Sequence, residues 1–391
     1  MILGVERLIE LRDRILRALR VLEDEPLSLE DALGRVLSKP VHAAVASPPE
    51  TCSAMDGYAV RAAAARGPVA LRLRTTIFAG DPLPPALGDG EADRILTGGL
   101  LPPGADAVVR EEAANVDGGR IVLKAAVRAG ENVRLAGEDV PSGGLALPAG
   151  ERLGPRQLAL LRAVGVEHVW VYRRPRVTVV STGDELLSGR TPDSNGLAVA
   201  WLCRSVGAVV SRERSADRIE AVREALSAAR SGADLVLTIG GVSVGERDLV
   251  PRALVDLGAE VRVHGVPMKP GKPFLFALLE GTPVMGLPGS PSACLAAFEV
   301  FARPALLALC GATKTVRTEL PLRLTEPVEG RPGRVRLHWA KLEPGGRARP
   351  LGREAAQIRG PALADLLLLL PKGAGNLPAG AEVSAWLLDD A

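Results

Sequence analysis

Residues 177–186 read VTVVSTGDEL, an apolar, β-branched run that ends in two hydroxyls, a glycine and two carboxylates. Such a run is typical of a buried strand. Further strand candidates follow it as far as residue 309: AVVSRE, DLVLTIGG, AEVRVH, PFLFALL and PVMGLPG. The helical stretches GLAVAWLCRSVG, RIEAVREALSAAR and ERDLVPRALVDLG lie between several of them. This alternation predicts an α/β domain with a largely parallel sheet.

The segments on either side of this region have different patterns. Before it, runs such as VALRLRTTIF and GRIVLKAAV are divided by glycine and proline, which predicts a β-rich domain. Helices are expected over residues 5–22, after Ser28 as N-cap, and between Pro155 and Gly165. After Gly311, strand-like runs predict a small C-terminal β domain.

Composition narrows the class of protein. The chain has 391 residues, enough for two to four domains, and its 48 basic and 46 acidic side chains give a net charge of +2, which offers no reason to expect nucleic acid as a partner. Four dispersed cysteines and four histidines form no zinc motif, and disulfides are not expected in a reducing cytosol. Charges at Glu6, Arg7 and Glu10 do not fit a signal peptide, and the apolar run at 366–370 is too short to span a bilayer. We therefore expect a cytoplasmic protein with no membrane segment.

The first candidate site follows the strand at 177–182. Ligands bind beyond the carboxyl ends of strands in open α/β sheets. The hydroxyls of Ser181 and Thr182 and the amide of Gly183 can hold phosphate, and Asp184 and Glu185 suit a hard cation such as Mg²⁺. A plain turn followed by a helix-start carboxylate explains the same residues equally well.

Two further loops end strands of the same predicted sheet. In GGVSVGERD, glycines permit close approach to a ligand before a helix N-terminus, and Glu246 and Asp248 offer metal ligands; the residues expected to contact substrate there are Gly240, Gly241, Ser243 and Gly245. In MKPGKP and GLPGSP, lysines present charge to phosphates and prolines stiffen the loop; the candidates are Lys269, Gly271, Lys272, Pro288, Gly289 and Ser290. Together the loops suit metal-assisted chemistry on a phosphate or nucleotide ester.

The β-rich region carries a second set of candidates. Asp56 lies in TCSAMDGYAV, residues 51–60, where Asp-Gly is usually a turn. Thr97 and Gly98 lie in another glycine-rich loop, and Arg134 and Asp139 lie in NVRLAGEDV. No Ser-His-Asp or Cys-His arrangement is visible, so covalent catalysis is not favoured.

These motifs, in their order along the chain, resemble the molybdopterin molybdenumtransferase family, which includes the E domain of gephyrin. The motifs are SAMDGYAV, LPPGADAVV, GEDV, STGDEL, DSN, GGVSVGERD, MKPGKP and GLPGSP. The resemblance implies an elongated helical part (residues 1–42 and 145–172), a β-rich domain (43–144), an α/β domain similar to molybdopterin adenylyltransferases (173–311) and a C-terminal β-barrel (312–391). It also implies a homodimer whose active site is shared between the α/β domain of one subunit and the β-rich domain of the other.

The implied reaction inserts molybdenum from molybdate into adenylylated molybdopterin, with Mg²⁺-dependent hydrolysis of the adenylate and release of AMP. Transferred to this sequence, Asp56, Asp139, Glu185 and Asp248 are catalytic, and Glu185 and Asp248 hold the metal. Substrate contacts fall to Thr97, Gly98, Arg134, Ser181, Thr182, Gly183, Asp184, Asn195, Gly240, Gly241, Ser243, Gly245, Lys269, Gly271, Lys272, Pro288, Gly289 and Ser290. Transient contact with a molybdopterin adenylyltransferase is a further implication.

The sequence departs from the family pattern at Ser290, Ser292 and Ala293, where asparagine, valine and serine are usual. Two other functions are consistent with the motifs: a nucleotide enzyme like the adenylyltransferases, and a non-catalytic scaffold with this fold. The β-rich domain with Asp56 distinguishes the first of these, because the adenylyltransferases lack it.

Overall fold

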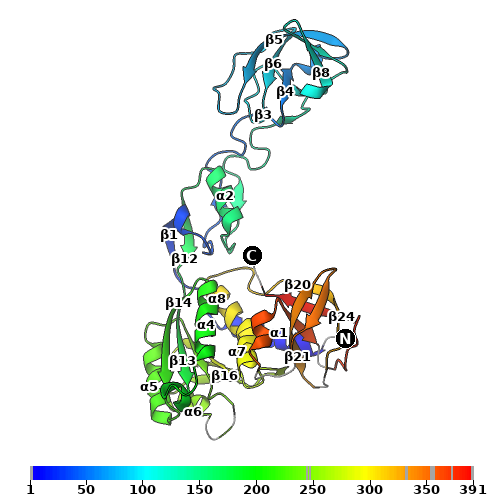
Figure 1. Ribbon diagram of the computed structural model, residues 1–391. Coiled ribbons are helices and arrows are strands. Elements are labelled where there is room, and N and C mark those ends of the chain that lie inside the picture. The colour runs from blue at the N-terminus through cyan, green and yellow to red at the C-terminus, as the bar shows by residue number, and fades with distance from the viewer. Residues whose placement is uncertain are drawn as a thin grey trace.

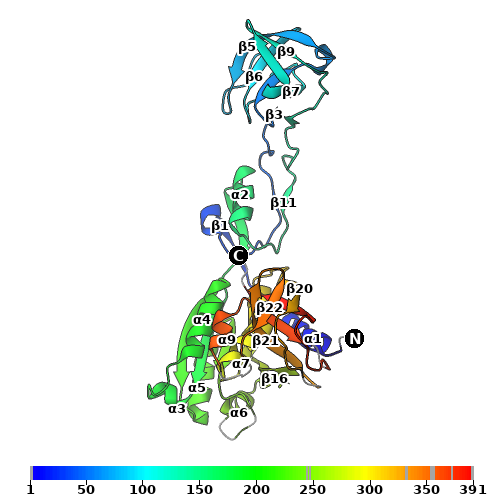
Figure 2. The ribbon, with the colours of Figure 1, turned by 45° about the vertical axis from the view of Figure 1, so that its right-hand side comes forward.

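The molecule is elongated. The computed structural model describes residues 3–243, 245, 248–330, 333–352, 357–370 and 373–388. A β-rich domain stands at one end, and a narrow central part joins it to an α/β domain and a β-barrel that lie together at the other end (Figures 1 and 2). This multidomain architecture confirms the expected fold class.

The α/β domain contains a six-stranded sheet in the order β14-β13-β15-β19-β18-β16. Its strands are β13 (Arg176–Thr182), β14 (Val209–Ser215), β15 (Leu235–Ile239), β16 (Glu260–His264), β18 (Leu275–Leu279) and β19 (Thr282–Leu287). The first four in the sheet order are parallel, and β18 and β16 are antiparallel to their neighbours. The helices between them are α3 (Asp184–Leu187), α4 (Ser194–Ser205), α5 (Ile219–Arg230) and α6 (Leu249–Asp256). The alternation read from the sequence therefore forms the sheet as predicted.

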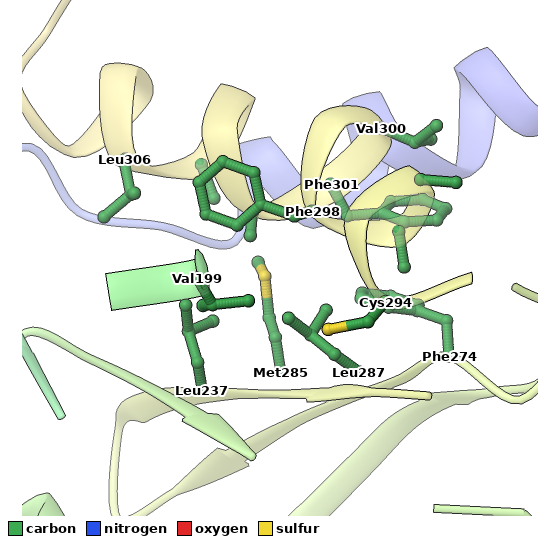
Figure 3. Packing of buried hydrophobic residues seen from close by; sticks show 14 of the residues in the cluster. Val199, Leu237, Phe274, Met285, Leu287, Cys294, Phe298, Val300, Phe301 and Leu306 are labelled. Carbon is green, nitrogen blue, oxygen red and sulfur yellow. The ribbon is translucent and has the colours of Figure 1, made fainter. Parts of the chain in front are cut away.

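One long apolar helix lies under this sheet. It runs from Pro291 to Leu309 as α7 (Pro291–Ala297), a π-helical turn (Phe298–Ala302) and α8 (Arg303–Leu309). Its mean hydropathy of 1.5 and its length would suffice to cross a membrane, but 89% of it is buried inside the protein. Figure 3 shows Phe298, Phe301 and Leu306 facing Val199, Met285 and Leu287 across the core. Core packing thus accounts for its apolar character.

The β-rich domain is built on a second six-stranded sheet, in the order β7-β4-β6-β5-β9-β8. The strands are β4 (Gly57–Val60), β5 (Val69–Ile77), β6 (Glu91–Ile95), β7 (Ala107–Arg110), β8 (Ala114–Asp117) and β9 (Arg120–Leu123). A short ladder of β3 (Cys52–Ser53) and β10 (Val133–Arg134) lies where this domain meets the central part. Gly57 is required in β4, because a Cβ there would lie 2.0 Å from the carbonyl oxygen of Val109.

The central part is less helical than expected. It contains α2 (Pro155–Ala163), which begins at Pro155 as predicted, and two antiparallel ladders: β1 (Asp24–Ser28) with β12 (His168–Tyr172), and β2 (Val41–His42) with β11 (Leu145–Leu147). The helix expected after Ser28 is wrong: Ser28 caps only a 3₁₀ turn at Leu29–Asp31. Gly34 then takes a φ of +77°, and the chain forms β-bridges with Arg152 and Val171 instead of continuing as a helix.

Helix α1 (Leu3–Arg17) does not belong to the central part either. Its buried residues Leu8 and Ile15 join the core of the α/β domain and the barrel, together with Phe301 and Leu337. Both views of the molecule place α1 beside the barrel (Figures 1 and 2). The sequence showed correctly that α1 is amphipathic, but its apolar face packs on a surface that only the folded chain creates.

The C-terminal domain is a closed barrel. Its strands are β20 (Glu319–Leu324), β21 (Val335–Glu343), β22 (Arg347–Pro350), β23 (Leu366–Leu370) and β24 (Glu382–Leu387), and pairing of β21 with β23 closes the ring. A further strand, β17 (Met268–Lys269), comes from the α/β domain and pairs with β21. A short helix, α9 (Arg359–Leu363), precedes β23. The apolar run at 366–370 is thus an interior barrel strand.

Candidate active site

The loop after β13 is held by its neighbours. Ser181 is buried, and its hydroxyl donates a 3.0 Å hydrogen bond to Asp193. The hydroxyl of Thr182 donates to the carbonyl of Ile239, at the end of β15. An added Cβ at Gly183 would lie 2.6 Å from a carboxylate oxygen of Glu185, so glycine lets the carboxylate fold back over the loop. Glu185 itself is exposed to solvent.

The glycines after β15 bring the second loop against the first. Gly240 and Gly241 have φ values of +86° and +63°, which glycine adopts at little cost. A Cβ at Gly240 would lie 3.0 Å from the hydroxyl oxygen of Thr182. Gly289, in the third loop, approaches Gly240 in turn: its Cβ position lies 3.4 Å from the Gly240 Cα. The amide of Asn195 donates a 2.7 Å hydrogen bond to the carbonyl of Gly289.

These contacts bring the loops after β13, β15 and β19 together at the carboxyl edge of the sheet. The contacts run from Thr182 to Gly240, from Gly240 to Gly289 and from Gly289 to Asn195, whereas Ser181 is hydrogen-bonded to Asp193. Pro288 and Ser290 flank Gly289, and Ser290 stands before the first residue of α7. The glycine-rich backbone of three loops thus lies at the carboxyl ends of the strands, the usual place for a ligand in this fold.

Asp193 is a residue that the sequence reading did not select. Its carboxylate is buried and accepts hydrogen bonds from Ser181, from the Gly196 amide at 2.9 Å and from Arg212 at 2.7 Å. It therefore caps α4 and fixes the end of β13 at the same time. The signal was present in the sequence, because aspartate directly before a helical stretch is a common N-cap.

The two candidate metal ligands differ in how much of each carboxylate is free. In Asp248, one carboxylate oxygen accepts a 2.8 Å hydrogen bond from the Gly245 amide, which closes the turn before α6. Glu246 lies outside the described residues. Within the described ranges, no group of three or more histidine, cysteine, aspartate or glutamate side chains forms a metal cage. Carboxylate oxygens such as those of Glu185 and Asp248 are ligands that Mg²⁺ prefers, and Mg²⁺ usually takes waters and substrate phosphate oxygens besides.

Lys269 and Lys272 do not line a common hollow. Lys269 is the last residue of β17, which pairs with β21 of the barrel. Its side chain lines a narrow cavity between the α/β domain and the barrel, together with Ser292 and Trp339. The indole of Trp339 donates a 2.8 Å hydrogen bond to the Ser292 hydroxyl, which ties the barrel to the start of α7. Gly271, with φ +105°, turns the chain so that Lys272 lines a different hollow, beside α1.

In the β-rich domain, the Asp56 and Thr97 loops meet directly. One carboxylate oxygen of Asp56 accepts hydrogen bonds from the amide and the hydroxyl of Thr97, both at 2.8 Å. These bonds, led by the backbone one, lower the pKa of Asp56 below its ordinary value, with a smaller contribution from the charge of Arg94. Gly98, at φ +81°, makes the turn and donates to the Ser53 carbonyl. Asp56 thus stands exposed, ionised and rigidly oriented.

Arg134 and Asp139 are less closely associated with this site. Arg134 lies opposite Cys52 in the ladder of β10 and β3, which brings it near the Asp56 loop. Its guanidinium, however, forms a 2.7 Å ion pair with Glu138. Asp139 lies in the neck between the domains, where its amide donates to the Ser47 carbonyl. The two sets of candidates therefore lie at opposite ends of the elongated chain: Asp56 in the β-rich domain, and the sheet-edge loops beside α3 and α6 (Figures 1 and 2).

Comparison with known proteins gives the same domains in the same order. Residues 7–165 match the MoeA N-terminal region (domains I and II), residues 178–308 a probable molybdopterin binding domain, and residues 321–388 the MoeA C-terminal region (domain IV). The fold and the site thus define a protein of the class built around a molybdopterin-binding α/β domain.

Individual relatives narrow this class. The molybdopterin molybdenumtransferase of Nostoc sp. is 38% identical over 308 residues, covering 75% of this chain and 71% of the relative; that of Staphylococcus aureus is 30% identical over 380 residues, covering 93% and 91%. Two crystal structures of Pyrococcus horikoshii MoeA proteins match with TM-scores of 0.75 and 0.83, at 31% and 26% identity; they cover 98% and 97% of this chain, and each is itself covered to 99%. The chain belongs to the molybdopterin molybdenumtransferase family of enzymes, as the motifs predicted.

Proposed function

We propose that this chain inserts molybdenum from molybdate into adenylylated molybdopterin, with hydrolysis of the adenylate and release of AMP. The observation that carries the proposal is the convergence of three strand-end loops with two carboxylates at their rim. Glycines at 240, 241 and 289 let the backbone approach phosphates closely, and Asn195 holds two of the loops together.

The two carboxylates have a defined part in this proposal. Glu185 and Asp248 would hold Mg²⁺, which when bound offsets the negative charge of the pyrophosphate bond. The backbone amides of the glycine loops would orient the phosphates, and the Thr182 hydroxyl would hold two of these loops together through its bond to the Ile239 carbonyl. Lys269 would add a positive charge at the barrel side of the crevice.

Asp56 supplies the second half of the proposed site. It is exposed and can accept a proton or orient a ligand close to the incoming oxyanion, and the Thr97 hydrogen bonds that lower its pKa also hold the carboxylate in place. Because Asp56 and the sheet-edge loops lie at opposite ends of one chain, they can act together only across two chains. We therefore include a homodimer with a shared site in the proposal; Asp139, in the neck, would then face the same cleft.

Two further parts of the proposal concern cellular context. A cytoplasmic location suits the four cysteines, which are all buried and carry free thiols in the described fold. Transient contact with a molybdopterin adenylyltransferase would deliver the adenylylated substrate directly.

The test supplies the purified chain with adenylylated molybdopterin, molybdate and Mg²⁺, and measures AMP by chromatography and active cofactor by reconstitution of an apo-molybdoenzyme. We expect both products to form together and to be lost when Mg²⁺ is chelated. Glu185→Gln should abolish both, whereas the matched change Glu224→Gln, on the exposed face of α5, should leave them unchanged. An adenylyltransferase would instead consume ATP and release pyrophosphate, and a scaffold would form neither product; each result contradicts the proposal.

A further inference from the structure

A strongly basic hollow lies beside α1, β16 and the residues that precede β21. Its volume is about 930 Å³, and its cationic lining residues are Arg7, Arg14, Arg17, Arg262, Lys272 and Arg334. We propose that this basic hollow binds a small polyphosphate, a ligand with two or more linked phosphate groups. The inference does not depend on the proposed reaction.

Helix α1 contributes three of these cations from one face. Arg7, Arg14 and Arg17 recur at intervals of seven and three residues, which places them along a single side of the helix. The adjoining face carries Leu8 and Ile15, both at most 2% exposed in the core. The arginine face is therefore fixed in orientation by core packing and cannot rotate away from the hollow.

The other wall comes from segments far away in the sequence. Arg262 extends from β16, Lys272 follows the turn at Gly271, and Arg334 immediately precedes β21 of the barrel. Cations from three regions of the chain thus face one concavity, an arrangement that the linear sequence does not reveal.

The charges of the basic hollow are poorly compensated. Arg262 is paired with Glu260 at 2.8 Å, and Glu10 is the one acidic residue among the described lining residues. Within the described ranges, no ion pair joins Arg7, Arg14, Arg17, Lys272 or Arg334 to a carboxylate. Like charges facing one another repel, so the cluster favours a multiply charged anion that several of them can share.

The shape and chemistry of the hollow select a small ligand. Its volume falls within the range of small-molecule sites, and its cations gather around one hollow instead of along an extended stripe that would track a nucleic-acid backbone. Guanidinium groups bind phosphate oxygens through paired hydrogen bonds, and several arginines match successive phosphates better than a single one.

The test measures binding to the full-length chain by isothermal titration calorimetry with inorganic tripolyphosphate, ATP, AMP and orthophosphate. We expect tripolyphosphate to bind more tightly than orthophosphate, and its affinity to fall about tenfold in each of Arg14→Gln and Arg17→Gln. Arg223→Gln, an exposed arginine on α5, is the matched control and should leave binding unchanged. Equal binding of ATP and tripolyphosphate would assign recognition to the phosphate chain alone, and tighter binding of ATP would add a base contact; both support a polyphosphate site.

Three outcomes would overturn the inference. Absence of tripolyphosphate binding is the first. Loss of that binding in Lys269→Gln, with retention in Arg14→Gln, would place the ligand in the candidate active site instead. Binding of duplex DNA that is tighter than that of tripolyphosphate and is weakened by the α1 changes would assign the hollow to nucleic acid. Thermal unfolding of each variant checks that the exposed substitutions leave the fold intact.

Discussion

At the scale of single residues, the turn at Asp56 both bends the chain and positions a carboxylate. The Asp-Gly pair does bend the chain, and Gly57 is required because the Val109 carbonyl approaches so closely. The bend presents the carboxylate to the Thr97 amide and hydroxyl while one oxygen stays open to solvent. The turn and the functional interpretation of Asp56 are therefore compatible, and the hydrogen bonds to Thr97 explain its lowered pKa.

This geometry predicts a pH effect. Thr97→Val keeps the backbone bond but removes the hydroxyl bond, so the pKa of Asp56 should rise toward its ordinary value. If ionised Asp56 is required, the acidic limb of kcat/KM should move to higher pH in the variant. The pH profile of AMP release measures this shift. The pH profile of the control Thr75→Val, a change at an exposed residue of the same domain, should superimpose on that of the wild type. An unshifted profile for Thr97→Val would show that ionisation of Asp56 does not limit the reaction.

At the scale of elements, a buried side chain holds the loop that follows β13. Asp193 joins β13, α4 and β14 through its contacts with Ser181, Gly196 and Arg212. The sequence showed that each loop follows a strand. It did not show that one buried carboxylate would connect the end of β13 to α4 and β14, because Asp193 and Arg212 meet only when β14 pairs with β13.

Asp193→Ala should therefore lower the free energy of unfolding by about 3 kcal/mol, since it removes a helix cap and leaves a partly buried guanidinium without its partner. Urea denaturation measures the loss. Asp256→Ala, an exposed carboxylate at the C-terminal end of α6, is the comparison and should be neutral or slightly stabilising. A change below 1 kcal/mol at Asp193 would refute the joining role assigned to it.

The long helix at 291–309 predicts a second stability effect. Phe301 stacks on Phe274 with ring centroids 4.0 Å apart, and both side chains are fully buried (Figure 3). Phe301→Ala should cost about 3–5 kcal/mol because it opens a cavity between the α/β domain and the barrel, and Phe301→Leu should cost less. Thermal unfolding compares the two variants, and equal melting temperatures would contradict the packing described here.

At the scale of the whole molecule, the elongated shape keeps Asp56 far from the loops at the edge of the α/β sheet. The barrel and the α/β domain pack against each other through β17, Trp339 and α1, whereas the β-rich domain stands apart at the end of a narrow neck (Figures 1 and 2). Asp56 and the sheet-edge loops therefore do not meet within one chain.

Mixing two inactive variants tests this arrangement. An Asp56→Asn chain and a Glu185→Gln chain, unfolded and refolded together at equal amounts, should form mixed dimers with one intact shared site. With random pairing, we expect about a quarter of wild-type activity. Each variant refolded alone should stay inactive. If purified mixed dimers also lack activity, both halves of the site would have to come from one chain.

The sequence by itself determined the fold class, the α/β alternation and the positions of the candidate loops, because hydrophobic periodicity and glycine-rich turns are local properties. Tertiary structure decided the rest. It moved α1 from the central part to the barrel, replaced the helix after Ser28 by a turn and bridges, separated Lys269 from Lys272, and gathered cations from three segments into one hollow. Each of these depends on which distant surfaces meet, and no local pattern encodes that.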